Sequence, residues 1–377
     1  MPKNYKRAQA VISLKNARYN FLEVKSKLKP STKICCVVKA DAYGHGAVEL
    51  SKLYQSLGAH FFATATFEEA VTLRNNGITK PILILGYTPP FYAKQLEILN
   101  LSQTVYSKEY GIALLKACKR QSAKIKIHLK IDTGLNRIGF VCQNKQTSNL
   151  NDAVKVLKND NFILEGIFTH FACSDDYKKG KSYTCKQQSN FLFAIKYLKS
   201  KGLNFQIKHA GNSAVVYNYL KFCLDMVRVG IVLYGISPSK LLKEKPKLKR
   251  VMTFKTIIES VKTVKKGCSV GYGLEYKAKR DVKVATLPVG YADGILRQIY
   301  KSDYRVLVNG VKCPFIGRVN MDKCTIDVTG VNAKVFDEVL IFGNDKNSNI
   351  ENFAKNCKTI PYEVACLISN RVEKYYD

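Results

Sequence analysis

Eight short strand-like segments, most of them rich in apolar residues, alternate with helical patterns between residues 34 and 229. The first of them, Ile34–Val38, is apolar at every position. Such a run is typical of a strand that is buried on both faces, as strands are in parallel sheets. The predicted strands are Ile34–Val38, His60–Ala65, Pro81–Gly86, Gln103–Tyr106, Ile125–Ile131, Phe162–Phe168, Phe205–His209 and Leu224–Val229.

The segments between these strands carry helical periodicity, at residues 14–28, 47–57, 68–76, 108–119 and 184–199. Alternation of this kind predicts right-handed βαβ units on a parallel sheet. Eight such units are the number that closes a (β/α)8 TIM-type barrel. An open doubly wound sheet is the alternative, but the GxGxxG turn of a dinucleotide site is missing after the first strand.

The sequence changes in character after Gly235. The lysine-rich stretch Lys240–Arg250 contains Pro246 and is typical of a linker or exposed loop. The sequence therefore predicts a barrel domain over residues 1–236 and a mostly β domain over residues 237–377, with residues 1–10 as candidates to join the second. The predicted β segments are Thr253–Ser260, Val282–Leu287, Tyr304–Val308, Lys312–Val319, Cys324–Val328 and Val339–Phe342, with a helix near Tyr362–Asn370.

Composition narrows the class of protein. The net charge is +32, but lysines occur along nearly the whole chain rather than in one stripe interleaved with aromatic residues. This pattern favours a solvated basic surface over a nucleic-acid site, and the charge can also attract anionic ligands. No apolar run of membrane-spanning length and no signal-peptide pattern is present, so we expect no membrane association. The 12 cysteines form no CxxC pair, which predicts free thiols in a reducing cytoplasm and no metal site.

Polar side chains recur where the predicted strands end. In a barrel, the carboxyl ends of all strands meet at one mouth, where the chemistry takes place. Each residue alone has an ordinary explanation, such as a lysine that extends into solvent or a serine that caps a helix. Together they predict one site. The residues concerned are Lys39, Lys130, Asp132, Arg137, His170, His209, Asn212, Ser213 and Arg228.

A lysine at a barrel mouth suits a particular chemistry. Apolar surroundings lower the pKa of an amine, so Lys39 can act as a base or form a Schiff base with a carbonyl compound. The loops after the seventh and eighth strands, with Asn212, Ser213, Gly230 and Ile231, suit a phosphate-bearing cofactor.

At this point the residues resemble a known family. The stretch VVKADAYGHG is similar to the pyridoxal-phosphate attachment motif of alanine racemases. The resemblance continues, in the family's order, through HLKIDTGLNRIGF, FTHFACSDD, HAGNSAVV, DMVRVGIVLYGISP, SVGYG, LPVGYADG, GRVNMDKCTID and PYEVACLISNR. It covers nearly the whole chain, from about residue 34 to residue 371.

The resemblance implies a pyridoxal 5'-phosphate enzyme that interconverts L- and D-alanine with two bases on opposite faces of the α-carbon. Lys39 would hold the cofactor and act on one face, and Tyr272 would act on the other. In this family the tyrosine comes from the β domain of a second subunit, so a homodimer with shared sites is implied. Supply of D-alanine for peptidoglycan is the implied role.

The resemblance also assigns roles to single positions. Arg228 would contact the pyridine nitrogen, where a cation that keeps its proton leaves the electron sink shallow. His170 would bond with Arg228 and adjoin Tyr272. Arg137 would approach the cofactor oxygen and the substrate carboxylate, and Lys130 is the position that is carbamylated in many members. The phosphate would be bound by Tyr43, Asn212, Ser213, Gly230, Ile231 and Tyr362; the substrate carboxylate would meet Met321; and Asp175, Tyr291, Arg297 and Arg318 would line the entrance.

Three alternatives stay open at this stage. The enzyme could be a racemase of broader specificity that accepts serine or lysine. It could be a non-catalytic pyridoxal-phosphate carrier, but such single barrels lack a β domain. It could be a barrel-type amino-acid decarboxylase, but those use a glutamate at the ring nitrogen where this chain has Arg228.

Overall fold

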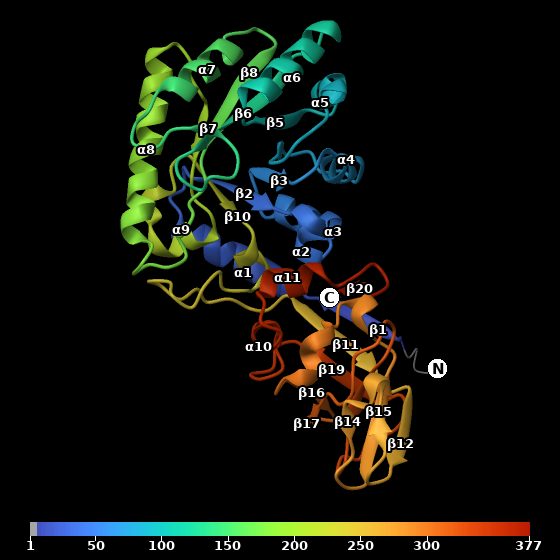
Figure 1. Cartoon of the computed structure of the whole chain (residues 1–377). Helices are drawn as coiled ribbons and strands as arrows, with labels where there is room; N and C mark the ends of the chain where they lie inside the picture. Colours follow the sequence, from blue (N-terminus) through green and yellow to red (C-terminus); the bar gives the residue numbers. More distant parts are fainter. Residues whose placement is uncertain (1–5) are drawn as a thin grey trace.

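The computed structural model describes residues 6–377, and their arrangement is drawn in Figure 1. Eight parallel strands follow one another around a barrel in the order β10, β2, β3, β4, β5, β6, β8 and β9. Each lies within a few residues of a predicted strand. Their bounds are Lys33–Val37 (β2), Phe61–Thr64 (β3), Ile82–Ile84 (β4), Leu101–Val105 (β5), Ile125–Asp132 (β6), Phe162–Phe168 (β8), Ile207–His209 (β9) and Met226–Val229 (β10).

The two ends of this strand order, β9 and β10, meet through backbone hydrogen bonds. Asp225 N donates to Lys208 O at 3.0 Å, and Arg228 N donates to Gly211 O at 2.9 Å. The barrel is therefore nearly closed, which confirms the predicted (β/α)8 architecture. The open doubly wound alternative is wrong.

Helices cover the outside of the barrel (Figure 1). The predicted helices are present as α1 (Leu14–Lys27), α3 (Ala47–Ser56), α4 (Phe67–Asn75), α6 (Lys108–Arg120) and α8 (Lys181–Ser200), and three further helices were not predicted, α5 (Ala93–Ile98), α7 (Ser148–Leu157) and α9 (Ser213–Asn218). Side-chain caps fix where they begin. Thr66 forms a capping box with Glu69 at α4, and Ser107 Oγ accepts from Tyr110 N at α6.

The rest of the chain is mostly β, as predicted. A six-stranded sheet has the order β17, β16, β19, β11, β1 and β20, and a three-stranded sheet has the order β12, β15 and β18. The bounds are Met252–Ile257 (β11), Ser260–Val264 (β12), Ser269–Val270 (β13), Tyr276–Lys277 (β14), Val282–Leu287 (β15), Arg305–Val308 (β16), Val311–Pro314 (β17), Cys324–Asp327 (β18), Glu338–Phe342 (β19) and Glu373–Tyr376 (β20), with helices Ile350–Asn356 (α10) and Pro361–Cys366 (α11).

The strand β1 (Ala8–Ile12) lies in the six-stranded sheet, away from the barrel strands (Figure 1). It runs antiparallel to β11, with Ala10 opposite Phe254, and parallel to β20, with Ala10 opposite Lys374. Residues 8–12 therefore pair with the C-terminal strands, while residues 1–5 lie outside the described part of the chain. No helix among residues 6–377 combines the length and the apolar character needed to span a membrane.

Candidate functional site

A pocket of about 550 Å³ opens at the carboxyl ends of the barrel strands. The predicted site residues that line it are Lys39, Tyr43, Lys130, Arg137, His170, Asp175, Asn212, Ser213, Arg228, Gly230, Ile231 and Tyr362. Seven barrel strands or their following loops contribute polar groups or walls to this cavity. Of the nine positions that the strand-end argument selected, seven line this cavity, whereas Asp132 and His209 do not.

The first turn after β2 places Lys39 and Tyr43 in the pocket. Residues 40–43 adopt left-handed helical backbone angles, with φ between 50° and 54°. Side chains four positions apart share one face of such a turn, so Lys39 and Tyr43 both point into the cavity. Each left-handed non-glycine residue costs roughly 1–2 kcal/mol, and such strain persists only where the surroundings enforce it.

Two carboxylates hold this left-handed turn in place. Glu69 Oε1 accepts from Ala40 N at 2.6 Å, and Asp41 Oδ1 accepts from Ala47 N at 2.7 Å. Asp41 also forms an ion pair with Lys374 at 3.0 Å. The turn is therefore fixed both by α4 of the barrel and by β20 near the end of the chain.

The turn also rests directly on C-terminal elements, which Figure 1 shows as α11 and β20 beside α2 (Lys39–Gly44). A Cβ atom on Gly44 would lie 2.1 Å from Ala365 O, and one on Gly46 would lie 1.9 Å from the Tyr376 hydroxyl oxygen. Both positions have positive φ and no room for a side chain, so both require glycine.

The Lys39 amine lies in an environment that disfavours its charged form. Burial is the main cause that lowers its pKa, and the positive charge of Arg137 adds to the effect. A lowered pKa favours the neutral amine, which is the form that acts as a nucleophile or base.

Arg228 is buried and held by acceptors from two strand ends. Its Nη1 donates to His209 Nδ1 at 2.9 Å, and its Nη2 donates to Thr169 O at 2.8 Å. The same Nη2 lies 3.2 Å from His170 Nδ1, as the family resemblance implied. Burial lowers the pKa of Arg228 to about 10, so the guanidinium still carries its charge at neutral pH.

Lys130 and Arg137 flank the pocket on the side of β6. Lys130 Nζ lies 4.9 Å from the centre of the Phe168 ring, and burial, with the charge of Arg228, lowers its pKa well below the usual range. Asp132 Oδ1 accepts from the backbone N–H groups of Gly134, Leu135 and Asn136 at 2.9 to 3.1 Å. These bonds shape the loop that carries Arg137.

Uncharged donors gather at the other end of the pocket. The Tyr43 ring packs against Tyr234 and Tyr362, with centroid distances of 5.0 and 6.0 Å. Gly230 N donates to Ser213 Oγ at 3.0 Å. A Cβ atom on Gly230 would lie 2.7 Å from the Tyr43 hydroxyl oxygen, so this backbone can approach a ligand beside that hydroxyl. Hydroxyl and backbone N–H donors of this kind suit a phosphate group, and an amine and a guanidinium line the rest of the cavity.

Five predicted site residues of the β domain do not line this pocket in the same chain. Tyr272, Tyr291, Arg297 and Met321 line a separate pocket of about 990 Å³ in the β domain. Tyr272 begins the 3₁₀ turn η4 (Tyr272–Leu274), and the residue is 72% exposed. Arg318 forms an ion pair with Glu275 beneath Gly273 and does not line this pocket.

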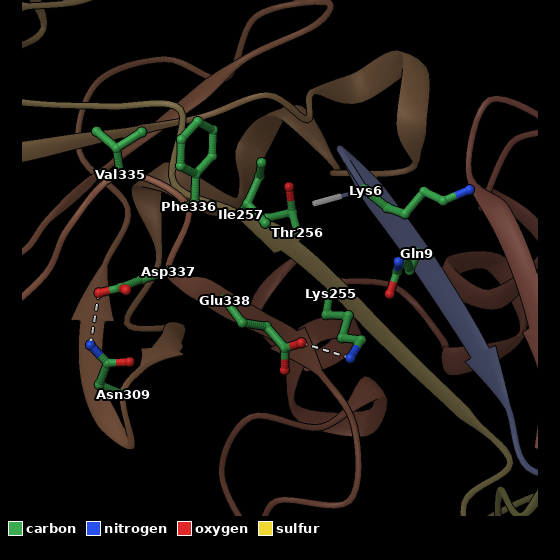
Figure 2. Close-up of a pocket in the computed structure, with 10 residues that line it drawn as sticks. All are labelled: Lys6, Gln9, Lys255, Thr256, Ile257, Asn309, Val335, Phe336, Asp337 and Glu338. Carbon is green, nitrogen blue, oxygen red and sulfur yellow. Dashed lines mark hydrogen bonds and ion pairs between the residues drawn. The ribbon is translucent and has the colours of Figure 1, made fainter. Parts of the chain in front are cut away.

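A third pocket, of about 500 Å³, lies beside β1 and β11 (Figure 2). Lys255 pairs with Glu338 at 2.6 Å, and Asn309 Nδ2 donates to Asp337 at 2.9 Å. These polar groups satisfy one another, and none of the predicted site residues lies among the lining residues. We therefore assign no role in the reaction to this pocket.

Sequence reasoning missed the residues that support the site from behind. Glu69 and Asp41 fix the left-handed turn. A further pair, His128 and Glu165, connects to Arg228 through His209, which the strand-end argument had selected. The available signal for His128 and Glu165 was an ionisable residue at an interior position of each of two predicted strands.

Comparison with known proteins covers almost the whole chain. Residues 12–238 match the family model described as "Alanine racemase, N-terminal domain", and residues 251–376 match "Alanine racemase, C-terminal domain". A curated relative named "Alanine racemase 1", from Caldanaerobacter subterraneus subsp. tengcongensis, is 40% identical over 95% of this chain and 92% of its own length.

Solved structures agree with this match. The structure titled "alanine racemase [Clostridium difficile 630]" is 38% identical, with a TM-score of 0.92 over 100% of this chain and 97% of that chain. The structure of alanine racemase from Bacillus anthracis with bound L-Ala-P is 32% identical, with a TM-score of 0.91 over 100% of this chain and 96% of that chain. The chain thus shares its sequence and fold with these proteins over both the barrel and the β domain.

Proposed function

Because the chain belongs to the alanine racemase family, we propose that it interconverts L-alanine and D-alanine with pyridoxal 5'-phosphate as its cofactor. The observation that carries the proposal is the barrel pocket, in which an amine, a buried guanidinium and a set of uncharged donors lie along one cavity. When bound, the cofactor supplies an electron sink that weakens the Cα–H bond of an amino acid.

The residues of the pocket fit the cofactor from end to end. Lys39 would bind its aldehyde covalently, and Arg228 would face its ring nitrogen. Arg137 would approach the cofactor oxygen and the substrate carboxylate. The phosphate would be held by Tyr43, Asn212, Ser213, Tyr362 and the backbone of Gly230 and Ile231.

Two bases would act on opposite faces of the substrate α-carbon. Lys39 would remove or return a proton at one face, and a tyrosine would do so at the other. Tyr272 is exposed and lines a separate pocket in the β domain of the same chain. The second base would therefore be the partner subunit's Tyr272. A homodimer with two shared sites therefore forms part of the proposal.

The same reasoning places the remaining predicted residues. The Met321 backbone N–H would meet the substrate carboxylate from the β domain. Tyr291 and Arg297 share the β-domain pocket, whereas Asp175 lines the barrel pocket, so the entrance would be built where the two surfaces meet. Arg318 would act there while paired with Glu275.

Arg228 and His170 would set the electrostatics of the reaction. A guanidinium donates but does not accept, so His170 Nδ1 accepts from Arg228 and the ring proton is left on Nε2. That N–H would point at the tyrosine phenol. Facing the ring nitrogen, Arg228 would leave it unprotonated and keep the electron sink shallow, which suits racemisation over competing reactions.

Lys130 has the properties that carbamylation requires, since its amine is buried and its pKa is well below the usual range. A carbamate there would place a negative charge near Arg137 and would orient it. Intact mass spectrometry under native conditions tests this step, because the adduct adds the mass of one carbon dioxide.

We place the enzyme in the cytoplasm, supplying D-alanine for peptidoglycan. All 12 cysteines are free thiols, and most of them are buried, as expected in a reducing compartment. The family match and the β domain argue against a non-catalytic carrier, and Arg228 together with the match argues against a decarboxylase.

A racemisation assay over a panel of L-amino acids, read by chiral chromatography, tests the proposed substrate. We expect D-alanine to form faster than any other D-amino acid, and the purified protein to absorb near the visible edge. Faster turnover of serine or lysine would replace the proposal with a racemase of broader specificity. Absence of the absorption after incubation with pyridoxal phosphate would refute the cofactor assignment.

A further inference from the structure

A chain of buried polar side chains runs from the pocket into the barrel interior. Arg228 Nη1 lies 2.9 Å from His209 Nδ1. His209 Nε2 lies 2.8 Å from His128 Nδ1, and His128 Nε2 lies 3.0 Å from Glu165 Oε2. The two histidines are completely buried, and Arg228 and Glu165 are nearly so.

The direction of every hydrogen bond in this chain follows from its first member. A guanidinium can only donate, so His209 Nδ1 must be the acceptor. A neutral His209 then carries its proton on Nε2 and donates to His128 Nδ1. By the same logic His128 is protonated on Nε2 and donates to Glu165, which accepts as a carboxylate.

The surroundings of His128 and His209 favour the neutral form of both rings. Burial lowers the pKa of His128, and burial together with the charge of Arg228 lowers the pKa of His209. Burial acts to raise the pKa of Glu165, but bonds from His128 and Ser102 and the charge of Lys126 outweigh it and lower that pKa. The chain therefore has a cation at one end and an anion at the other.

The site is built to hold the two rings. The His209 ring stacks on Phe168 with centroids 4.9 Å apart and planes within 9°. A Cβ atom on Gly166 would lie 2.3 Å from His128 Nδ1, so a glycine at this position makes room for that ring. At the far end Ser102 Oγ donates to Glu165, and Lys126 lies 3.8 Å from its other oxygen.

We propose that Glu165 is a positioning residue for Arg228. Acting through His128 and His209, its carboxylate accepts the last hydrogen bond of the chain and holds the guanidinium at the inner wall of the pocket. Among the described residues, the groups that accept hydrogen bonds from the Arg228 guanidinium are two histidine nitrogens and two backbone carbonyls. Glu165 is thus its counter-ion through two neutral rings, which stabilise the buried charge. This inference rests on the proposed function only in assigning the pocket occupant that Arg228 faces.

The protonation pattern can be measured without any substitution. Long-range ¹H–¹⁵N correlation spectra of histidine-labelled enzyme with pyridoxal phosphate bound distinguish Nδ1 from Nε2 protonation, and the sequence has only 5 histidines. We expect both His128 and His209 to be protonated on Nε2 alone at neutral pH. A proton on Nδ1 of either ring would overturn the proposal, whatever reaction the enzyme catalyses.

The variant Glu165→Gln removes the charge and keeps the shape. We expect kcat for alanine to fall about tenfold, the equivalent of roughly 1.4 kcal/mol, with KM changed less than about twofold. The absorption maximum of the bound cofactor should shift as well. The matched control is Glu351→Gln, which removes a half-buried carboxylate that pairs with Arg250 in another part of the molecule. If Glu165→Gln matches this control in kcat and spectrum, Glu165 does not position Arg228.

Discussion

Lys39 and Tyr272 line two different pockets of the same chain. The amine lies at the mouth of the barrel, and the phenol lies exposed on the β domain. No single chain therefore holds both proposed bases in one cavity, and in the proposed homodimer each complete site would need two subunits.

This arrangement predicts complementation between two inactive variants. Lys39→Ala would be inactive alone and Tyr272→Phe nearly so, but a mixed dimer would contain one intact site. If subunits exchange at random, half of the dimers are mixed and each has one good site of two, so about a quarter of wild-type activity should return. The measurement is racemase activity after co-refolding, with each variant refolded alone as the control. Failure to recover activity would refute shared sites.

The two variants should also differ in their spectra. Lys39→Ala should lose both activity and the absorption of the covalently bound cofactor. Tyr272→Phe should keep that absorption, and its kcat should fall by about 10²- to 10⁴-fold, the usual contribution of one general acid or base. Stopped-flow and steady-state assays in both directions check this. Equal loss of absorption in both variants would contradict the assigned roles.

The left-handed turn predicts an unusually large effect of one methyl group. Gly44→Ala places a Cβ atom 2.1 Å from Ala365 O, whereas Gly77→Ala, at a similar positive φ, meets nothing within 4 Å. We expect Gly77→Ala to cost about 1 kcal/mol of unfolding free energy, the strain of φ alone. Gly44→Ala should cost at least about 3 kcal/mol. Urea unfolding of the two variants measures the difference, and equal costs would show that the contact with α11 is unimportant.

His45 predicts a pH dependence of stability. Burial lowers its pKa to about 4, while the unfolded chain takes up this proton near pH 6.5. The stability that neutral His45 provides is therefore fully present above about pH 6.5 and is lost as the pH falls toward 4, by up to about 1.4 kcal/mol per pH unit. The unfolding free energy of wild type minus that of His45→Gln should fall over this range and stay constant from pH 7 to pH 8. The remaining histidines titrate in both proteins, so the difference isolates His45.

The barrel was predictable because the local sequence of its strands indicates where they begin and end. Most are short segments rich in apolar residues between turns, and strands such as Ile125–Asp132 are buried on both faces. The strand β1 was not predicted as a strand, because its partners in β11 and β20 lie more than two hundred residues away in the sequence. Its five residues carry little periodicity of their own, and tertiary pairing decides their conformation.

The site was predictable to the extent that its residues sit at strand ends. The barrel rule selected Lys39 and Arg228, and the pocket contains both. It could not predict the left-handed backbone of residues 40–43, since non-glycine residues have no local preference for it. Nor could it predict that His128 and Glu165 meet, because this depends on the register between two neighbouring strands.

The contacts of Gly44 with Ala365 and of Gly46 with Tyr376 bear on the order of events during synthesis. The turn that orients Lys39 is synthesised early. The elements that hold this turn in its left-handed conformation, α11 and β20, are synthesised last. A nascent chain on the ribosome can complete its barrel strands and still present the lysine in a relaxed loop. We therefore expect binding of the proposed cofactor in its native orientation to be one of the final steps of maturation. A chain that stops before Ala365 would form the barrel without the fixed left-handed turn.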